Sequence, residues 1–106
     1  YQWFDRWFCD PLDLEICAKV RAIAEERGTT MAEVALAWVL SKDFICSPLI
    51  GADSSEHVEN NIKALDLSLS GDEIEILDEL YRPRDVLNDY VRNPMPRHLG
   101  GVLKRT

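Results

Sequence analysis

Residues 47–61, SPLIGADSSEHVENN, form the stretch of this sequence whose residue types and spacing could do chemistry. A short apolar run ends at Gly51, and the two serines after Asp53 can begin a helix. The first backbone N–H groups of a helix have no partner within the helix, and they lie at the positive end of its dipole. A turn of this kind favours an anion, so the sequence predicts an anion-binding loop here.

Other reactive side chains are few. The cysteines, Cys9, Cys17 and Cys46, are odd in number and widely spaced, and no second Cys or His stands at zinc spacing. We therefore predict no metal site. Reduced and mostly buried thiols in a cytoplasmic protein are the plain interpretation of this pattern.

Size and charge exclude several classes of protein. The 106 residues fit one ordinary domain. A net charge of −7 argues against nonspecific binding to nucleic acid. No apolar run approaches the roughly 20 residues that span a bilayer, and no signal peptide is found, so no membrane partner is predicted. The first residue, Tyr1, suggests a piece of something longer.

The first half of the chain is predicted to contain two helices that meet at a short joint. Asp10 can cap the first helix, Pro11 fits its first turn and Gly28 is a natural stop. Thr30 and Glu33 have the spacing of a capping box that begins the second helix. The predicted apolar faces are Leu12, Ile16, Val20 and Ile23 in the first helix, and Met31, Val34, Ala35 and Trp38 in the second.

Residues 44–50 are the only convincing strand, although Pro48 lacks an N–H. A lone strand leaves unpaired N–H and C=O groups on both sides, and each buried unpaired group costs about 1–3 kcal/mol. The flanking sheet must come from another chain or from an N-terminal part, unless the segment is not a strand here.

Two further helices are predicted after the strand. Ser54 or Ser55 can cap the first, with Val58, Ile62 and Leu65 on one face. Ser70 and Glu73 have the spacing of a second capping box. The residues expected to point inward from the helix that follows are Ile74, Leu77, Leu80 and Tyr81.

The segments AEERGTTMAEVALAWVLSK (24–42), SPLIGADSSEHVENNIKALDLSLSGDEIEILDEL (47–80) and YRPRDV (81–86) resemble the C-terminal third of the aldo-keto reductases. The resemblance is closest to the aryl-alcohol-dehydrogenase-like and potassium-channel β-subunit-like branch. It implies an α/β fold, the (β/α)8 TIM barrel, and reduction of aldehydes and ketones with NADPH. As an isolated chain, the protein would be mostly α-helical with one strand.

The resemblance also divides the chain into parts. It implies an aromatic loop segment, a split helix, the last barrel strand, the last barrel helix, an extra helix outside the barrel and an irregular tail; these are residues 1–9, 10–41, 44–50, 55–65, 71–81 and 82–106. Aromatic residues recur in the first part, which walls the substrate or cofactor site in the family. Packing or an interface is the more common use of such a stripe, here Trp3, Phe4, Trp7 and Phe8.

By this resemblance, one set of residues would hold the adenosine-phosphate end of NADP: Ile50, Gly51, Ala52, Asp53, His57, Asn60 and Asn61. Asp53 stands where the family commonly has Ser or Arg. Its carboxylate would repel the 2′-phosphate of NADPH and could instead accept the ribose hydroxyls of NAD. A simple helix cap is the alternative role for Asp53, and a partnerless surface histidine is the alternative for His57.

No catalytic residue is predicted in this chain. The family uses an Asp, a Tyr, a Lys and a His on earlier strands, and none of Tyr1, Tyr81 and Tyr90 follows an identifiable strand. A small-molecule carbonyl substrate is expected only with a complete barrel, and an isolated chain without any bound cofactor is the alternative. The alternative is a non-catalytic, self-associating helical interaction module. Either way, we expect a homo-oligomer or association with the remaining barrel part.

Overall fold

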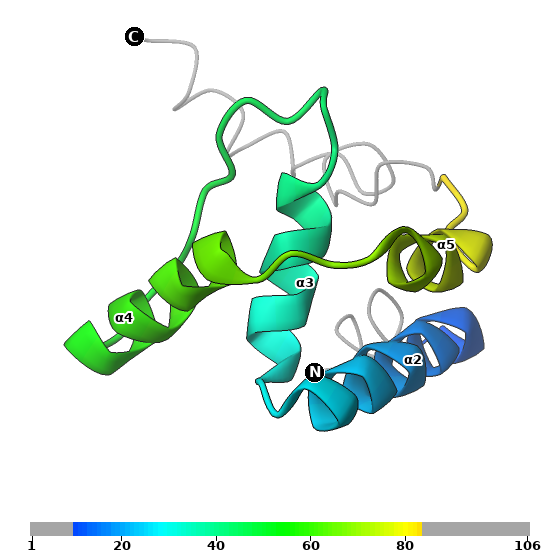
Figure 1. Cartoon of the computed structure of the whole chain (residues 1–106), viewed down its shortest axis with the longest axis horizontal. Helices are drawn as coiled ribbons and strands as arrows, with labels where there is room; N and C mark the ends of the chain where they lie inside the picture. The colour runs from blue at the N-terminus through cyan, green and yellow to red at the C-terminus, as the bar shows by residue number, and fades with distance from the viewer. Residues whose placement is uncertain (1–9, 84–106) are drawn as a thin grey trace, which may run out of the picture.

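A computed structural model describes residues 10–83 of the chain (Figure 1). These residues form α2 (Pro11–Arg27), α3 (Met31–Leu40), α4 (Ser55–Lys63), the short 3-10 helix η1 (Ala64–Asp66) and α5 (Gly71–Glu79). Helix α3 contacts α2, α4 and η1, while α5 packs against α2. Figure 1 shows α2 and α5 on one side of α3 and α4 extending on the other. The predicted aromatic segment 1–9 and the tail from residue 84 lie outside the described residues.

The predicted ends of α2 are confirmed. The Asp10 carboxylate accepts a hydrogen bond from the N–H of Leu12 at 2.8 Å, and Pro11 occupies the first turn. Gly28 ends the helix with φ 64° and ψ 34°, a left-handed conformation that costs little only for glycine. The apolar stripe of α2 leads to Ile23, which is buried.

The start of α3 confirms only half of its predicted capping box. The Thr30 hydroxyl accepts from the N–H of Glu33 at 3.2 Å, as expected. The Glu33 carboxylate, however, accepts from the hydroxyl of Thr29 and not from the Thr30 backbone. Threonine at position 29 offers a competing donor. The predicted inward face is also wrong at one position, because Ala35 is exposed and Ala37 is buried.

The start of α5 has the complete capping box that the sequence predicts. The Ser70 hydroxyl accepts from the N–H of Glu73 at 3.2 Å, and the Glu73 carboxylate accepts from the N–H of Ser70 at 2.7 Å. Leu77 points inward and is buried, as expected. Tyr81 was expected to point inward too, but it is 53% exposed because the helix ends at Glu79, before that residue.

The core lies where α2, α3 and α5 meet. Its buried residues are Ile23 and Ala24 from α2, Val34 from α3 and Leu77 from α5. Val34 is fully enclosed, with 0% exposure. Five partly buried side chains complete the cluster: Val20, Met31, Trp38, Leu67 and Leu69. The segment between η1 and α5 thus contributes to the same core.

The predicted strand at residues 44–50 is wrong for this structure. No strand is found within residues 10–83, which are helices joined by irregular segments. Within that range, the backbone groups of residues 46–50 form no hydrogen bond to other backbone groups. Phe44 is 80% exposed and Leu49 is 100% exposed. A strand requires a neighbour to pair with, and the described part of the chain supplies none.

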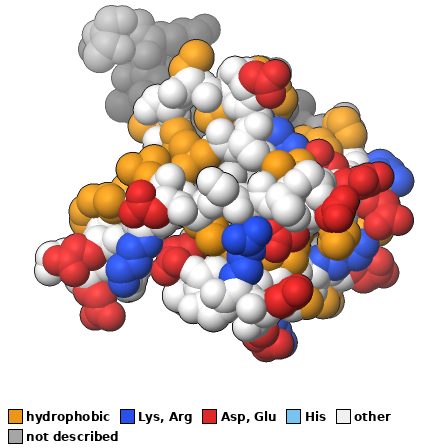
Figure 2. Space-filling model, in the orientation of Figure 1, with side chains coloured by type: hydrophobic (Ala, Val, Ile, Leu, Met, Phe, Trp, Pro, Cys, Tyr) orange, Lys and Arg blue, Asp and Glu red, His pale blue; other side chains and the backbone are white. Residues whose placement is uncertain are grey.

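The helical region predicted at 55–65 is present as α4 followed by η1. Its apolar stripe is not covered: Val58 is 40% exposed, Ile62 is 52% exposed and Leu65 is 69% exposed. In Figure 2 hydrophobic side chains gather along this side of the molecule, over α4 and the segment above it. No helix within residues 10–83 has both the length and the apolar character needed to cross a bilayer.

Candidate functional site

The predicted cofactor loop folds back onto α4. The side-chain amide of Asn61 donates to the carbonyl of Gly51 at 3.2 Å. One turn earlier on the same helix, Nδ1 of His57 accepts from the backbone N–H of Asp53 at 3.4 Å. Residues four apart share one face of a helix, so this face holds both ends of the short turn. The structure thus brings together four of the residues predicted from the sequence.

The other predicted cofactor residues lie differently. Asn60 turns along α4, where its side-chain oxygen accepts from Nζ of Lys63 at 3.0 Å. Ala52 is exposed on the turn. Ile50 and Asn61 line an apolar groove of about 200 Å³ between α3 and α4, together with Leu36, Leu40, Pro48, Ile62 and Leu65.

The cap of α4 is Ser54, which decides between the two serines considered from the sequence. Its hydroxyl accepts from the N–H of His57 at 3.2 Å. The alternative role of Asp53 as the helix cap is therefore wrong. The partnerless role considered for His57 is wrong as well, because its ring accepts from Asp53 and its backbone binds the cap.

The ring of His57 is placed to present one donor outward. Because Nδ1 accepts the hydrogen bond, the proton of the neutral imidazole belongs on Nε2, an assignment that follows from the hydrogen-bond network. A Cβ added at Gly51 would meet no atom within 4 Å. The backbone of the turn is therefore open to close approach by another molecule, as it is at Gly28 and Gly71.

The charge of the loop is negative. Asp53, Glu56 and Glu59 carry carboxylates, and no Lys or Arg occurs between residues 47 and 62. The helix N-terminus partly offsets this charge. Neutral donors and carboxylates suit the hydroxyls of a ribose and the edge of an adenine, whereas a phosphate of about −2 charge would meet repulsion.

The cysteines differ from their predicted burial. Cys17 and Cys46 are free and exposed, because the first lies beside the apolar stripe of α2 and the second lies in the unpaired segment. Cys9 lies outside the described residues. Within residues 10–83, no group of His, Cys, Asp or Glu is arranged to hold a metal ion.

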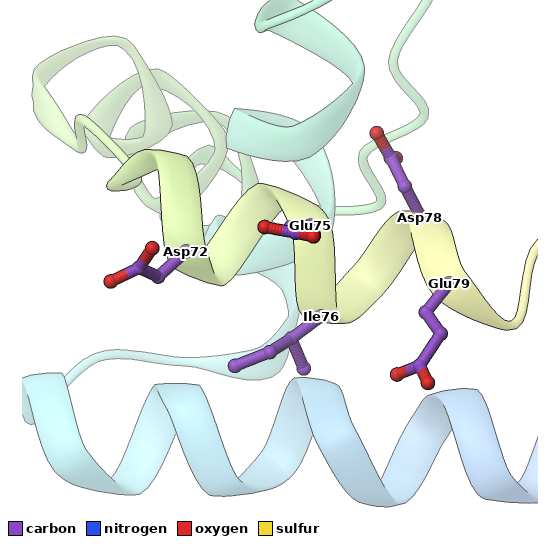
Figure 3. Close-up of a pocket in the computed structure, with 5 residues that line it drawn as sticks. All are labelled: Asp72, Glu75, Ile76, Asp78 and Glu79. Carbon is purple, nitrogen blue, oxygen red and sulfur yellow. The ribbon is translucent and has the colours of Figure 1, made fainter.

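Helix α5 carries several carboxylates around Ile76 (Figure 3). Figure 3 shows them pointing in different directions, with Asp78 and Glu79 on opposite sides of the helix. Glu79 binds Lys19 of α2 at 2.9 Å, and Asp78 binds Lys42 at 2.6 Å. The hydrogen bonds from Lys42 and Lys19 lower the pKa values of Asp78 and Glu79. Two of these carboxylates thus join α5 to other parts of the chain, Glu79 to α2 and Asp78 to the segment after α3.

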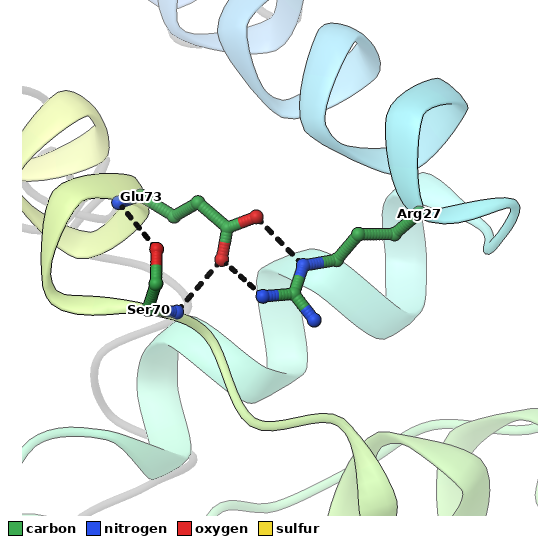
Figure 4. A network of polar contacts seen from close by, with 3 residues as sticks. All are labelled: Arg27, Ser70 and Glu73. Atoms are coloured by element: carbon green, nitrogen blue, oxygen red, sulfur yellow. Dashed lines mark hydrogen bonds and ion pairs between the residues drawn. The ribbon is translucent and has the colours of Figure 1, made fainter.

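A second polar network joins the end of α2 to the start of α5 (Figure 4). The guanidinium of Arg27 donates through Nε and Nη2 to the two carboxylate oxygens of Glu73, each at 2.6 Å. The hydrogen bond from Arg27, with help from the backbone N–H of Ser70, lowers the pKa of Glu73 to about 2. The sequence analysis did not predict this contact, which joins residues 46 positions apart.

Trp38 is the centre of a third cluster. Its indole N–H donates to Asp78 at 2.7 Å, and Nζ of Lys42 lies 4.7 Å from the ring centroid. The ring of Tyr81 packs against Trp38 with the centroids 5.9 Å apart. Lys42 thus contacts both Asp78 and the ring of Trp38, and the Tyr81 ring packs on the same tryptophan.

The profile of the Aldo/keto reductase family matches residues 6–82. The chain therefore belongs to the aldo/keto reductase family, whose fold is the TIM barrel. This confirms the resemblance seen in the sequence. The helical structure of residues 10–83 is that of an isolated portion of such a protein.

Individual relatives are oxidoreductases by name. The chain is 41% identical over 58 residues to the L-glyceraldehyde 3-phosphate reductase of Escherichia coli, which covers 54% of this chain and 17% of the relative. It is 36% identical over 72 residues to an aldo-keto reductase of Fusarium vanettenii, covering 68% of this chain and 19% of the relative. It is 30% identical over 77 residues to the aryl-alcohol dehydrogenase [NADP(+)] of Phanerodontia chrysosporium, and the match covers 72% of this chain and 20% of the relative. The chain thus spans about a fifth of the length of these relatives.

Proposed function

We propose that the chain is the C-terminal portion of an NAD(P)H-dependent aldo-keto reductase and provides the adenosine-phosphate side of its cofactor site. The observation that carries this proposal is the turn at Gly51–Asp53, which is tied to α4 by the hydrogen bonds of Asn61 and His57. Two side chains one helical turn apart fix this exposed turn beside the N-terminus of a helix, whose free backbone N–H groups can donate to a ligand. The carboxylates of the loop suit ribose hydroxyls better than a phosphate.

The nicotinamide supplies hydride to a small-molecule carbonyl when the cofactor is bound. This chain's residues would bind and orient the far end of that cofactor. The open backbone at Gly51 permits close approach, and the ring of the exposed His57 would donate a hydrogen bond. Asn61, beside the turn, would offer its amide to the adenine edge, whereas Asn60 would have to turn from Lys63 to do so. Asp53 would accept the ribose hydroxyls, which favours NAD over the NADP named for the aryl-alcohol dehydrogenase relative.

The residues that transfer the proton to the carbonyl would lie outside this chain. In residues 10–83, Lys42 is bound to Asp78, and Tyr81 packs on Trp38. We therefore expect the isolated 106-residue chain to show no carbonyl reductase activity. The measurement is NADPH consumption with an activated aromatic aldehyde at high protein concentration. Turnover well above a buffer blank would contradict this expectation.

The cofactor proposal is tested by changing the charge at Asp53. Residues 47–66 replace the matching segment of the Escherichia coli reductase, and binding of NADPH and NADH is titrated with and without Asp53→Arg. Arginine exchanges repulsion of the 2′-phosphate for a charge-assisted hydrogen bond. The preference for NADPH should rise by about 1–3 kcal/mol, or roughly 5- to 150-fold. It should fall again as salt rises, because the loop is exposed.

Glu59→Arg is the matched control, since it makes the same charge change on α4 but at an exposed position away from the face of His57 and Asn61. It should move the preference by much less. An unchanged preference in the Asp53 variant would show that Asp53 does not face the ribose. Equal effects of the two variants would show a general charge effect and no contact.

A second candidate function is a non-catalytic, self-associating helical module. The observation in its favour is the uncovered apolar stripe of Val58 and Ile62 on α4, continued by Leu65 on η1. Under this proposal the chain is a homo-oligomer and needs no cofactor. Neither proposal includes binding to nucleic acid or to a membrane.

A further inference from the structure

His57 occupies the third position of α4, from which a side chain can reach back to the backbone that precedes the helix. The backbone N–H of His57 donates to the hydroxyl of Ser54, and Nδ1 of its ring accepts from the N–H of Asp53 at 3.4 Å. Glu73 has the same position in α5, where its carboxylate accepts from the N–H of Ser70. The start of α4 therefore resembles a capping box in which an imidazole replaces the carboxylate and binds one residue further back.

An imidazole differs from a carboxylate in the pH at which it stops accepting a hydrogen bond. A carboxyl group ordinarily takes up a proton at about pH 4, whereas histidine changes its charge between about pH 5 and 8. A charged imidazole donates from both nitrogens and accepts from neither. Protonation of His57 therefore breaks its hydrogen bond to Asp53, and the backbone N–H of Asp53 becomes a free donor of the turn.

The charged groups beside His57 are carboxylates of its own helix and turn. Asp53 lies before the helix, Glu56 is the preceding residue in sequence, and both are exposed. Helix α3 packs against α4 and carries one titratable side chain, Glu33. The other charged groups on α4, and on η1 that also packs against it, are Glu59, Lys63 and Asp66. Protonation of His57 therefore places a positive charge among carboxylates at the start of α4.

We propose that His57 selects between NADPH and NADH by its protonation state. With a neutral ring, the N–H of Asp53 is occupied and the carboxylates make the turn negative, so a ribose hydroxyl is favoured over a 2′-phosphate. Protonation makes three changes that favour the phosphate: it frees the N–H of Asp53, makes Nδ1 a donor and adds a positive charge. This inference rests on the proposed cofactor site and adds its regulation by pH.

The direction of the pH effect follows from proton linkage. A ligand that favours the charged ring binds more tightly as the pH falls through the titration of that ring. NADPH should therefore bind more tightly at acid pH, whereas the affinity for NADH, which has no 2′-phosphate, should change much less. A phosphate monoester also takes up a proton near about pH 6, so a control must separate protonation of the cofactor from protonation of His57.

Two substitutions at position 57 fix the two states of this switch. His57→Asn places an uncharged oxygen, which can accept a hydrogen bond, at about the position of Nδ1, so it represents the neutral ring. His57→Arg has a permanent positive charge and no acceptor, so it represents the charged ring. Both variants keep the backbone N–H that donates to Ser54 at the helix cap.

The first test uses the chimera that carries residues 47–66 in the Escherichia coli reductase, titrated with NADPH and NADH between about pH 8 and about pH 5.5. Over this range the NADPH/NADH affinity ratio of the unmodified chimera should rise about 3- to 10-fold more than that of His57→Asn. The ratio of His57→Arg should already be high at about pH 8 and should rise no more than that of His57→Asn. An equal rise in the unmodified chimera and in His57→Asn would overturn the proposal, because protonation of the phosphate would then explain it.

Nuclear magnetic resonance of the full 106-residue chain tests the switch without any cofactor. The ring signals of His57 are assigned by their loss in His57→Asn. The amide signal of Asp53 should shift with the same pH midpoint as this ring, and the shift should be absent from the variant. An Asp53 amide that does not follow the titration of the ring would overturn the proposal.

Asp53→Arg in the chimera distinguishes failure of this inference from failure of the proposed function. If Asp53→Arg raises the preference for NADPH while every variant at position 57 shows the same pH dependence, the cofactor site stands and selection by His57 is wrong. If the chimera binds neither cofactor, the proposed function is wrong, and selection by His57 is wrong with it.

Discussion

Helices α4 and α5 have 9 residues each, and each begins with a serine cap. They differ in how much of their apolar face is buried. Helix α5 buries Leu77 in the core formed with α2 and α3. Helix α4 has no buried residue, although its stripe of apolar residues is regular. An amphipathic pattern therefore indicates which face of a helix is to be buried, but not which part of the molecule buries it.

Polar contacts sharpen the difference between the two helices. Helix α5 is joined to distant parts of the chain by the pairs Arg27–Glu73, Lys42–Asp78 and Lys19–Glu79. The polar contacts of α4 are local, such as Lys63 to Asn60 and Asn61 to Gly51. We infer that α2, α3 and α5 form one cooperative unit and that α4 opens more easily.

Leu77→Ala should give the largest effect, because it removes a side chain that is only 4% exposed from the shared core. The expected loss is about 2–5 kcal/mol in the free energy of unfolding, measured by urea denaturation. Its neighbour Ile76, 43% exposed, is the matched control and should lose less than about 1 kcal/mol on change to alanine.

Ile62→Ala on α4 extends the same comparison across the molecule. This residue is 52% exposed, so its truncation should also cost less than about 1 kcal/mol in the single chain. A loss as large as that of Leu77→Ala would show that the stripe of α4 is covered in solution. The contrast between the two helices would then be removed.

Local features of the fold could be predicted from the sequence because their causes are local. Asp10, Gly28 and the Ser70–Glu73 pair act on backbone groups within a few residues, and the structure confirms all of them. The strand at 44–50 could not be settled in this way. Its apolar run is consistent with a strand, but pairing depends on a neighbour that the described part of the chain does not contain.

The candidate site was predictable in its residue types and less so in its contacts. The Gly51 turn and the face of α4 follow from the serine cap and helical spacing, so His57 and Asn61 were expected near the turn. The contact between Asn60 and Lys63 was not predicted, because it depends on which side of α4 the Asn60 side chain occupies. The Arg27–Glu73 contact joins residues that are 46 positions apart, and no local sequence pattern predicts a contact over that separation.

Removal of each helix cap should give an intermediate effect that separates the two regions. Ser70→Ala removes a capping box from the packed unit and should lower the free energy of unfolding by about 1 kcal/mol. Ser54→Ala should reduce helical circular dichroism through fraying of α4, with little change in the urea midpoint. Equal shifts of the midpoint in the two variants would mean that α4 unfolds together with the rest.

The smallest effect concerns acid stability and again sets the α2–α5 contact apart. The Arg27 hydrogen bonds lower the pKa of Glu73 from 4.5 to about 2, so the folded state binds this proton less readily than the unfolded chain. The stabilisation from this group is present above about pH 4.5 and is lost as the pH falls towards 2. Glu73→Gln should therefore flatten that part of the pH–stability curve, as followed by urea midpoints. Glu75→Gln on the same helix, at an exposed position without an ion pair among residues 10–83, should leave the slope unchanged. If both variants flatten the curve equally, general relief of negative charge explains the effect and the Arg27 contact does not.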